Sequence, residues 1–176
     1  LVPHADSVLE NTAEGAQAAI KRVLEREKNR PAKDVATREA AAECSFEEVT
    51  RTYWGRPIES LVEYGQPAAF DSGVALLDSP TQFEEAATGL AAAGAHLVVH
   101  VTADGVPTGH PIVPTIKITG NESTAAALKK DIDLDATSTT ADELTEFIAA
   151  VADGQRSSTE KHGLSEFAIT RVGPSM

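Results

Sequence analysis

Three polar loops follow three apolar, β-branched runs, and these loops hold most of the side chains here that could bind a small ligand. The runs span 73–77, 97–101 and 114–119. Because loops at the carboxyl ends of parallel strands converge on one edge of a sheet, we expect the three loops to face one ligand. The candidate ligand-binding residues are Asp78, Ser79, Thr102, Gly105, Thr108, Gly109, His110, Lys117 and Asn121. The loop residues among them also have an ordinary interpretation as turn or cap residues.

The middle loop, residues 102–110, suits an anion or a hydroxyl group. Gly105 and Gly109 with Thr108 could form a backbone cradle for an anion, and the His110 imidazole could donate to a hydroxyl or a carboxylate. The spacing is neither that of a P-loop nor that of a dinucleotide fingerprint, so a nucleotide function is poorly supported.

Lys117 is the one cation within the central apolar runs. A buried lysine needs a partner, because an isolated charge is costly to remove from water. Asp78 or Asp104 could serve structurally, and a substrate carboxylate could serve functionally.

Other chemical patterns in the chain are incomplete. The alternating Asp131, Asp133 and Asp135 open like a calcium loop, but the sixth and twelfth positions lack the required glycine and glutamate. We expect these aspartates to lie on a solvated strand or turn face, and we assign no metal ligand.

Histidine and cysteine chemistry is also weakly supported. His96 and His100 share one face of a strand but lack a third metal ligand nearby, and Cys44 has no neighbouring histidine or basic cluster. The sequence therefore indicates no catalytic base or nucleophile, and the catalytic residues stay unknown.

The elements that would position these residues alternate between helix and strand. Strands are predicted at 58–64, 73–77, 97–101, 114–119 and 167–172. Helices are predicted at 7–30, 81–93, 122–130 and 140–153. Three of them begin with a capping box, formed by Ser7 and Glu10, by Thr81 and Glu84, and by Thr140 and Glu143, and Asn121 caps the helix at 122–130. Gly94 and Gly154 are predicted to end the helices before them. The predicted fold is α/β, a three-layer, Rossmann-like, mainly parallel sheet with an N-terminal helical segment.

Length and charge narrow the functional class. A chain of 176 residues fits one hydrophobic core of ordinary size. We divide the chain into a helical segment at 1–56, packed on the domain, and an α/β domain at 57–176. The net charge of −12 makes nucleic acid an unlikely partner, since a phosphate backbone needs a basic face. The absence of a long apolar stretch argues against a membrane span, and the single cysteine fits a reducing, cytoplasmic setting.

The motifs in the second half of the chain resemble those of the C-terminal domain of the altronate and galactarate dehydratase family. The resemblance covers about 57–172. The matching stretches are Leu77-Asp78-Ser79-Pro80, Thr88-Gly89-Leu90, Ala93-Gly94-Ala95, Pro107-Thr108-Gly109, Pro114-Thr115-Ile116-Lys117-Ile118-Thr119-Gly120-Asn121, Ile132-Asp133-Leu134-Asp135-Ala136 and Glu166-Phe167-Ala168-Ile169.

This resemblance implies part of a sugar-acid hydro-lyase, which removes water from an aldonic or aldaric acid to give a 2-keto-3-deoxy acid. It also implies a divalent metal (Fe²⁺, Mn²⁺ or Mg²⁺) held mainly by a preceding catalytic domain or subunit, and a possible homo-oligomer. The nine candidate residues would then hold sugar hydroxyls and close the site. Because the chain begins at Leu1 instead of Met, we expect it to be incomplete by itself.

The sequence also departs from the family pattern. The family's Thr-Thr-Gly-Arg-Gly loop reads Val101-Thr102-Ala103-Asp104-Gly105 here, so Asp104 replaces a cation suited to a sugar-acid carboxylate. The alternative is therefore a non-catalytic binding or assembly domain that kept the fold.

Overall fold

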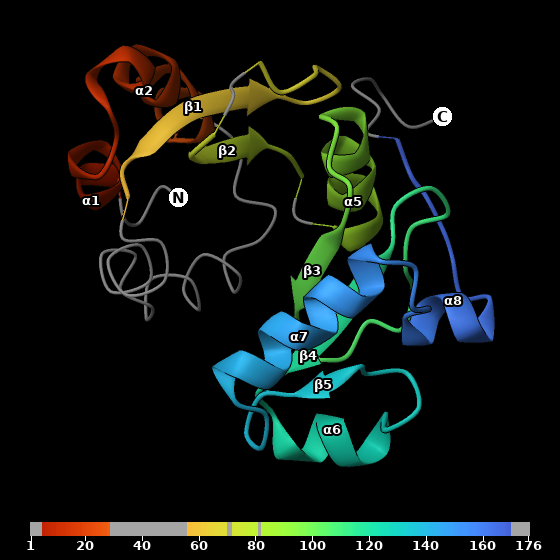
Figure 1. Cartoon of the computed structure of the whole chain (residues 1–176). Coiled ribbons are helices and arrows are strands. Elements are labelled where there is room, and N and C mark those ends of the chain that lie inside the picture. Colours follow the sequence, from red (N-terminus) through yellow and green to blue (C-terminus); the bar gives the residue numbers. More distant parts are fainter. Residues whose placement is uncertain (1–4, 29–55, 70–71, 81, 170–176) are drawn as a thin grey trace. The chain divides into compact units, whose positions relative to one another are not determined.

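The computed structural model describes residues 5–28, 56–69, 72–80 and 82–169, which form two compact units, Leu1–Asp78 and Ser79–Met176 (Figure 1). The boundary between these units falls after the second strand, whereas the sequence placed a domain boundary at 56/57. Within the described ranges, every helix is too short or too polar to cross a bilayer.

The first unit packs two helices on a pair of parallel strands. Helices α1 (Ala5–Glu10) and α2 (Glu14–Lys28) precede strands β1 (Ile58–Glu63) and β2 (Val74–Asp78). The core is made by the buried side chains of Val8, Ile20, Leu24 and Ile58. The two strands agree with the predicted ones within one residue at each end.

The predicted continuous helix at 7–30 is wrong, because the chain breaks between α1 and α2. At the break, the Asn11 carbonyl accepts from the Ile58 N–H (2.7 Å), and the Ala13 N–H donates to the Ile58 carbonyl (2.8 Å). The break therefore exchanges helical hydrogen bonds for pairing with the start of β1. Ser7 lies inside α1, so it is not the N-cap that its spacing from Glu10 predicted.

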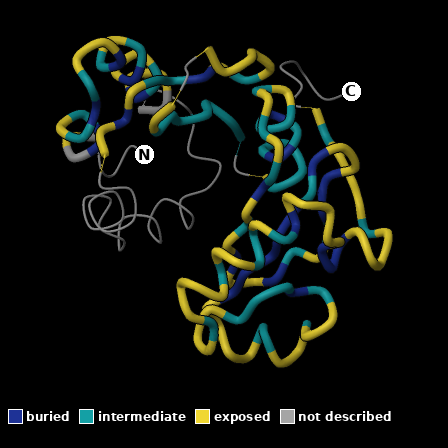
Figure 2. Tube along the Cα trace, viewed as in Figure 1, coloured by how far each residue is buried: buried dark blue, intermediate teal, exposed yellow. Residues whose placement is uncertain are grey.

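The second unit is built on a three-stranded parallel sheet in the order β3-β4-β5. Its elements are α5 (Phe83–Ala92), β3 (Val98–Val101), β4 (Thr115–Thr119), α6 (Glu122–Ala127), β5 (Leu134–Asp135), α7 (Ala141–Ala152) and α8 (Ser158–His162). All five residues of the central strand β4 are buried, which Figure 2 shows in dark blue.

The two faces of β4 differ in chemistry. Ile116 and Ile118 pack with Val151 of α7 in an apolar cluster. The alternate residues Thr115, Lys117 and Thr119 point to the opposite face, where Lys117 meets α5, because side chains alternate along a strand. Helices on both faces make this unit three-layered.

Several local signals of the sequence are confirmed. Asn121 caps α6 by accepting from the N–H groups of Ser123 (3.0 Å) and Thr124 (3.3 Å). Thr140 and Glu143 form the predicted capping box of α7. Gly94 and Gly154 follow their helices with positive φ values of 97° and 104°, which suit glycine. Thr81 lies outside the described residues, and the N-cap of α5 is Gln82, whose side chain makes no capping bond.

The α/β class with parallel strands is confirmed, but its strands are shared between a two-stranded and a three-stranded sheet. The predicted strand at 167–172 is wrong for 167–169, which form no strand, while 170–172 lie outside the described residues. Exposed Phe167 and Ile169 lie just beyond an isolated bridge between Gly109 and Ser165. The short β5, which the sequence did not predict, pairs with β4 at the end of the strand order.

Candidate functional site

The most unusual group in the second unit is the side chain of Lys117, which is 0 % exposed at the centre of β4. Parallel pairing sets His100 of β3 beside it, and Lys117 Nζ lies 2.9 Å from His100 Nδ1. The same Nζ lies 3.6 Å from the centroid of the Phe83 ring, which stacks on the His100 ring at a centroid distance of 4.2 Å. A histidine and an aromatic face thus enclose the amine.

The start of α5 adds a carboxylate to this cluster. The Glu84 Oε1 atom accepts from the Thr108 hydroxyl at 3.0 Å, so the loop after β3 is tied to the helix that carries Phe83. Thr108 was a predicted site residue, whereas Phe83 and Glu84 were not. We define the Lys117 cluster as Lys117, His100, Phe83, Glu84 and Thr108.

Burial controls the protonation of this cluster. Burial lowers the pKa of Lys117 from 10.5 to about 8, and nearby Glu84 and Asp133 oppose the change. Burial and then the Lys117 charge lower the pKa of His100 from 6.5 to about 4, with Glu84 opposing. The histidine is therefore neutral near pH 7, and its Nδ1 accepts a hydrogen bond from the ammonium group.

The predicted carboxylate partners of Lys117 are not the ones found. Asp78 accepts two hydrogen bonds from Arg26 (2.7 and 2.9 Å), and Asp104 is exposed. Among the described residues, no carboxylate lies within 4.0 Å of Lys117 Nζ, so the ammonium relies on His100 and an aromatic ring. A buried cation with so few hydrogen-bond acceptors is a candidate functional group, because structural charges are usually paired.

Three predicted residues gather at the carboxyl edge of the β3-β4-β5 sheet. Thr102 follows β3, and its hydroxyl oxygen accepts from the Gly105 N–H at 3.0 Å. Asn121 follows β4 and caps α6, and the Thr124 hydroxyl of that helix donates to the Ala103 carbonyl at 2.6 Å. The two loops are therefore fastened together. At Gly105, φ is +72°, and a Cβ would collide with the side chains of Leu128 and Thr124, so only glycine fits.

His110 lies at the other end of β4, and its predicted place beside Asn121 is wrong. The His110 N–H donates to the hydroxyl of Thr115, the first residue of β4, at 3.2 Å. Gly109 also lies there, against Thr159. The reason is geometric: a loop between parallel strands must return from the carboxyl end of one to the amino end of the next, and His110 comes late in it.

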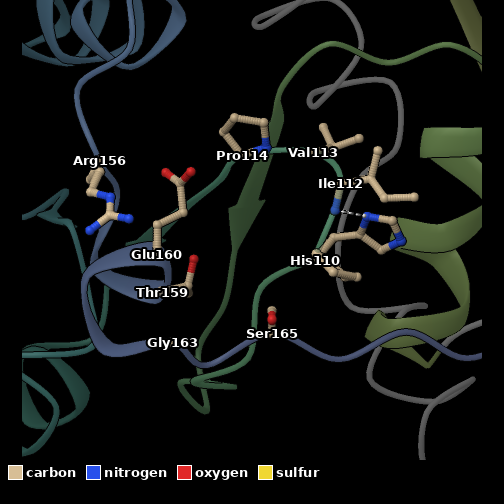
Figure 3. A pocket seen from close by; sticks show the side chains of 10 residues that line it. His110, Ile112, Val113, Pro114, Arg156, Thr159, Glu160, Gly163 and Ser165 are labelled. Carbon is tan, nitrogen blue, oxygen red and sulfur yellow. Dashed lines mark hydrogen bonds between the residues drawn. The ribbon is translucent and has the colours of Figure 1, made fainter.

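This opposite edge carries a pocket of about 260 Å³ between the loop at 110–114 and helix α8 (Figure 3). Arg156, Thr159, Glu160 and Ser165 are among its lining residues. Burial lowers the pKa of His110, and its Nδ1 accepts from the Ile112 N–H at 3.3 Å.

The remaining predicted residues, Asp78 and Ser79, lie at the end of β2. Asp78 belongs to the first unit, where it and Arg26 line a pocket of about 400 Å³ together with Arg22 and Tyr64. The Ser79 hydroxyl donates to the Pro80 carbonyl at 3.1 Å.

The alternating aspartates have structural roles, because their carboxylates contact other groups of the protein. Asp133 Oδ2 accepts from the Lys117 N–H (2.8 Å), and its Oδ1 accepts from the N–H and hydroxyl of Ser158 (both 2.7 Å). Asp131 Oδ1 lies 3.3 Å from His162 Nδ1. Hydrogen bonds from Thr137 lower the pKa of Asp135. Each carboxylate therefore already has protein donors.

A divalent metal does not fit the described residues. They contain no group of three or more His, Cys, Asp or Glu side chains arranged to hold an ion. The Lys117 cluster contains a buried ammonium group, which would repel a metal ion, and Asp133 uses both its oxygens for hydrogen bonds. Cys44 lies outside the described residues.

Sequence reasoning missed the partners of Lys117 and the pocket arginine. His100 was recognised only as one of two histidines on a strand, and its pairing with Lys117 depends on the register of two strands. Phe83 and Glu84 open a helix, and nothing in their local pattern indicates that they meet Lys117. Arg156 lies in a polar linker without a motif.

Comparisons with known proteins converge on one family. A family model described as D-galactarate/altronate dehydratase, C-terminal, matches residues 45–175. Altronate dehydratase of Escherichia coli (strain K12) is 34% identical over 109 residues, which are 57% of this chain and 22% of that protein. Altronate dehydratase of Bacillus subtilis (strain 168) is 31% identical over 126 residues, 66% of this chain and 25% of that protein.

A third relative carries a different name. The (2R)-sulfolactate sulfo-lyase subunit beta of Chromohalobacter salexigens is 29% identical over 109 residues, 57% of this chain and 28% of that subunit. The chain thus spans about a quarter of the length of the relatives that it matches. Because the family model matches well over half of the chain, the protein belongs to the D-galactarate/altronate dehydratase family, as a C-terminal domain.

Proposed function

We propose that the protein is the C-terminal part of a hydro-lyase that converts an aldonic or aldaric acid into a 2-keto-3-deoxy acid. The observation that carries this proposal is the family match over residues 45–175. The relatives named altronate dehydratase support a sugar acid as the substrate class.

The elimination of water from a sugar acid requires groups that stabilise negative charge. Elimination removes the proton α to the carboxylate, expels the β-hydroxyl as water, and leaves an enol that becomes the ketone. Charge develops on the carboxylate side during proton removal, and a cation in a low-dielectric site stabilises it more strongly than an exposed cation does. Lys117 is such a cation in the second unit, and we assign it a positioning and electrostatic role.

The carboxyl edge of the sheet would hold sugar hydroxyls. The Oδ1 atom of exposed Asn121 is engaged by the N–H groups of α6, which leaves its amide NH₂ as a donor. Thr102 accepts from Gly105 through its hydroxyl oxygen, which leaves its proton to donate. Asp78, Ser79 and Thr108 stay predictions for closing the site, whereas Gly109 and His110 lie at the opposite end of β4 and would have to act from there.

The complete enzyme would include a preceding domain or subunit, since the chain spans about a quarter of its relatives. We place any divalent ion (Fe²⁺, Mn²⁺ or Mg²⁺) and the acid–base residues there. A cytoplasmic location and a homo-oligomeric state belong to the same proposal.

One observation favours a second candidate function. Exposed Asp104 adds a negative charge to the 102–105 loop, where a substrate carboxylate would be repelled. The alternative is a non-catalytic binding or assembly domain.

The test joins the chain to the preceding domain of the same gene and measures 2-keto acid formation from altronate and galactarate with each metal. We expect no turnover by the isolated chain and turnover by the combined protein. Lys117→Met should lower kcat about tenfold or more, whereas the exposed control Lys129→Met should not. Failure of the combined protein on a panel of sugar acids would support the alternative.

A further inference from the structure

The pocket at the amino end of β4 is a separate site from the carboxyl-edge residues considered above. It lies between the loop at 110–114 and helix α8, and its volume is about 260 Å³. That volume is a little below the range of about 300–1,000 Å³ that is usual for ligand pockets, so it suits a ligand of a few carbon atoms.

One wall of this pocket is polar. Arg156 is exposed and makes no hydrogen bond or ion pair with the residues that the structure describes. Glu160 Oε2 accepts from the N–H (2.9 Å) and hydroxyl (3.2 Å) of Ser157, which fixes the carboxylate and leaves Oε1 available. Figure 3 labels both Arg156 and Glu160 among the side chains that line this pocket. Ser165 adds a hydroxyl group to the lining.

The opposite wall is apolar and held in place. It consists of Pro111, Ile112, Val113 and Pro114. His110 fixes this turn, because its ring accepts from the Ile112 N–H and its own N–H donates to Thr115. Ile112 is 82% exposed, so its side chain is accessible to the carbon atoms of a ligand.

The charges select the chemistry of the ligand. A guanidinium group suits a carboxylate, which it can bind through two parallel hydrogen bonds. The free oxygen of Glu160 and the Ser165 hydroxyl suit hydroxyl groups, and the Glu160 charge disfavours a phosphate dianion so close to a single cation. We propose that this pocket binds a small hydroxycarboxylate, with its carboxylate on Arg156 and its hydroxyls on Glu160 and Ser165.

The test is an NMR titration of the ¹⁵N-labelled 176-residue chain with D-gluconate. Xylitol, acetate and inorganic phosphate serve as probes that each lack one part of the proposed ligand. We expect gluconate to shift the amide signals of His110, Ile112, Val113 and residues 156–165, and to bind at least about tenfold more tightly than the other three probes. Equal binding of acetate or phosphate would show a general anion site, and equal binding of xylitol would show that the carboxylate is irrelevant; either result overturns the proposal.

Two variants separate recognition from folding. Arg156→Gln should weaken gluconate binding about tenfold or more, and Ser165→Ala should weaken it less. Lys161→Gln is the matched control, since it removes one positive charge from α8 at a position that does not line the pocket. Unchanged binding by Arg156→Gln, with spectra that confirm its fold, would overturn the proposal. The result does not depend on dehydratase turnover.

Discussion

Replacing Lys117 with methionine should remove a pH-dependent cost to folding. The amine is completely buried, and burial lowers its pKa to about 8 from the 10.5 of an exposed lysine. At about 1.4 kcal/mol per pH unit, this difference corresponds to about 3 kcal/mol of unfolding free energy. Methionine has a similar length, carries no charge, and needs no hydrogen-bond partner.

The sign follows from proton binding. Between pH 8 and 10.5 the unfolded chain holds the Lys117 proton more tightly than the folded chain does, so the stability of the wild type rises with pH there. Below pH 8 the whole cost is present, and above pH 10.5 it is gone. The variant lacks this titration, so its stability advantage over the wild type should shrink by about 3 kcal/mol across that interval.

At neutral pH the advantage is smaller than the full cost. The substitution also removes the hydrogen bond to His100 and the contact with the Phe83 ring. These interactions contribute about 1 kcal/mol each, so we expect Lys117→Met to stabilise the second unit by about 1 kcal/mol at pH 7. Lys117→Arg, which keeps its charge at every pH and needs more space, should destabilise the unit throughout.

The assay must report on the second unit alone. Urea unfolding followed by the methyl NMR signals of Ile116 and Ile118 does so, because both side chains lie in the apolar cluster under β4. Lys129→Met, at an exposed position, is the control and should show a constant difference from the wild type. A constant difference for Lys117→Met between pH 7 and 10.5 would refute the reasoning.

Substitutions at Asn121, Asp133 and His100, each with a control, test the supports of the sheet by the same urea assay. Asn121→Ala should cost about 1 kcal/mol because α6 loses its cap, and Asn121→Asp should restore most of it. Asp133→Ala should lower the unfolding free energy by about 3 kcal/mol, because it leaves backbone N–H donors on β4 and α8 unpaired. The control Asp131→Ala should lower it by under about 1 kcal/mol. Equal losses for the two variants would contradict the role assigned to Asp133. Folding lowers the pKa of His100 from 6.5 to about 4, so the unfolded chain binds this proton more tightly than the folded chain does. The unfolding free energy of the wild type should therefore fall by up to about 3 kcal/mol as the pH drops from 6.5 to 4. His100→Asn should lack this loss, and exposed His96→Asn should keep it.

Local signals in the sequence determined several helix caps and the longer strands of both units. The caps at Asn121 and at Thr140 with Glu143 depend only on hydrogen bonds within one turn of helix, so spacing alone predicts them. The strands at 58–63, 74–78, 98–101 and 115–119 were also predicted, because short β-branched runs bounded by polar turns have few alternative structures.

Contacts between distant segments decided the rest. The break before α2 exists because Asn11 and Ala13 pair with Ile58, far along the chain, and no helical pattern records that preference. The strand predicted at 167–172 had the right composition, but its described residues 167–169 form no strand, and the bridge to Gly109 lies before them at Ser165.

For the candidate site, the sequence by itself determined the residue types: a lysine in a buried strand, and polar loops at the ends of strands. Tertiary structure decided which of them meet. It gave Lys117 a neutral histidine and an aromatic ring in place of a carboxylate, and it moved His110 to the opposite end of β4. The physical reason is that strand register and the return path of a crossover loop are set by the packing of whole elements, whereas composition and spacing specify only what each element carries.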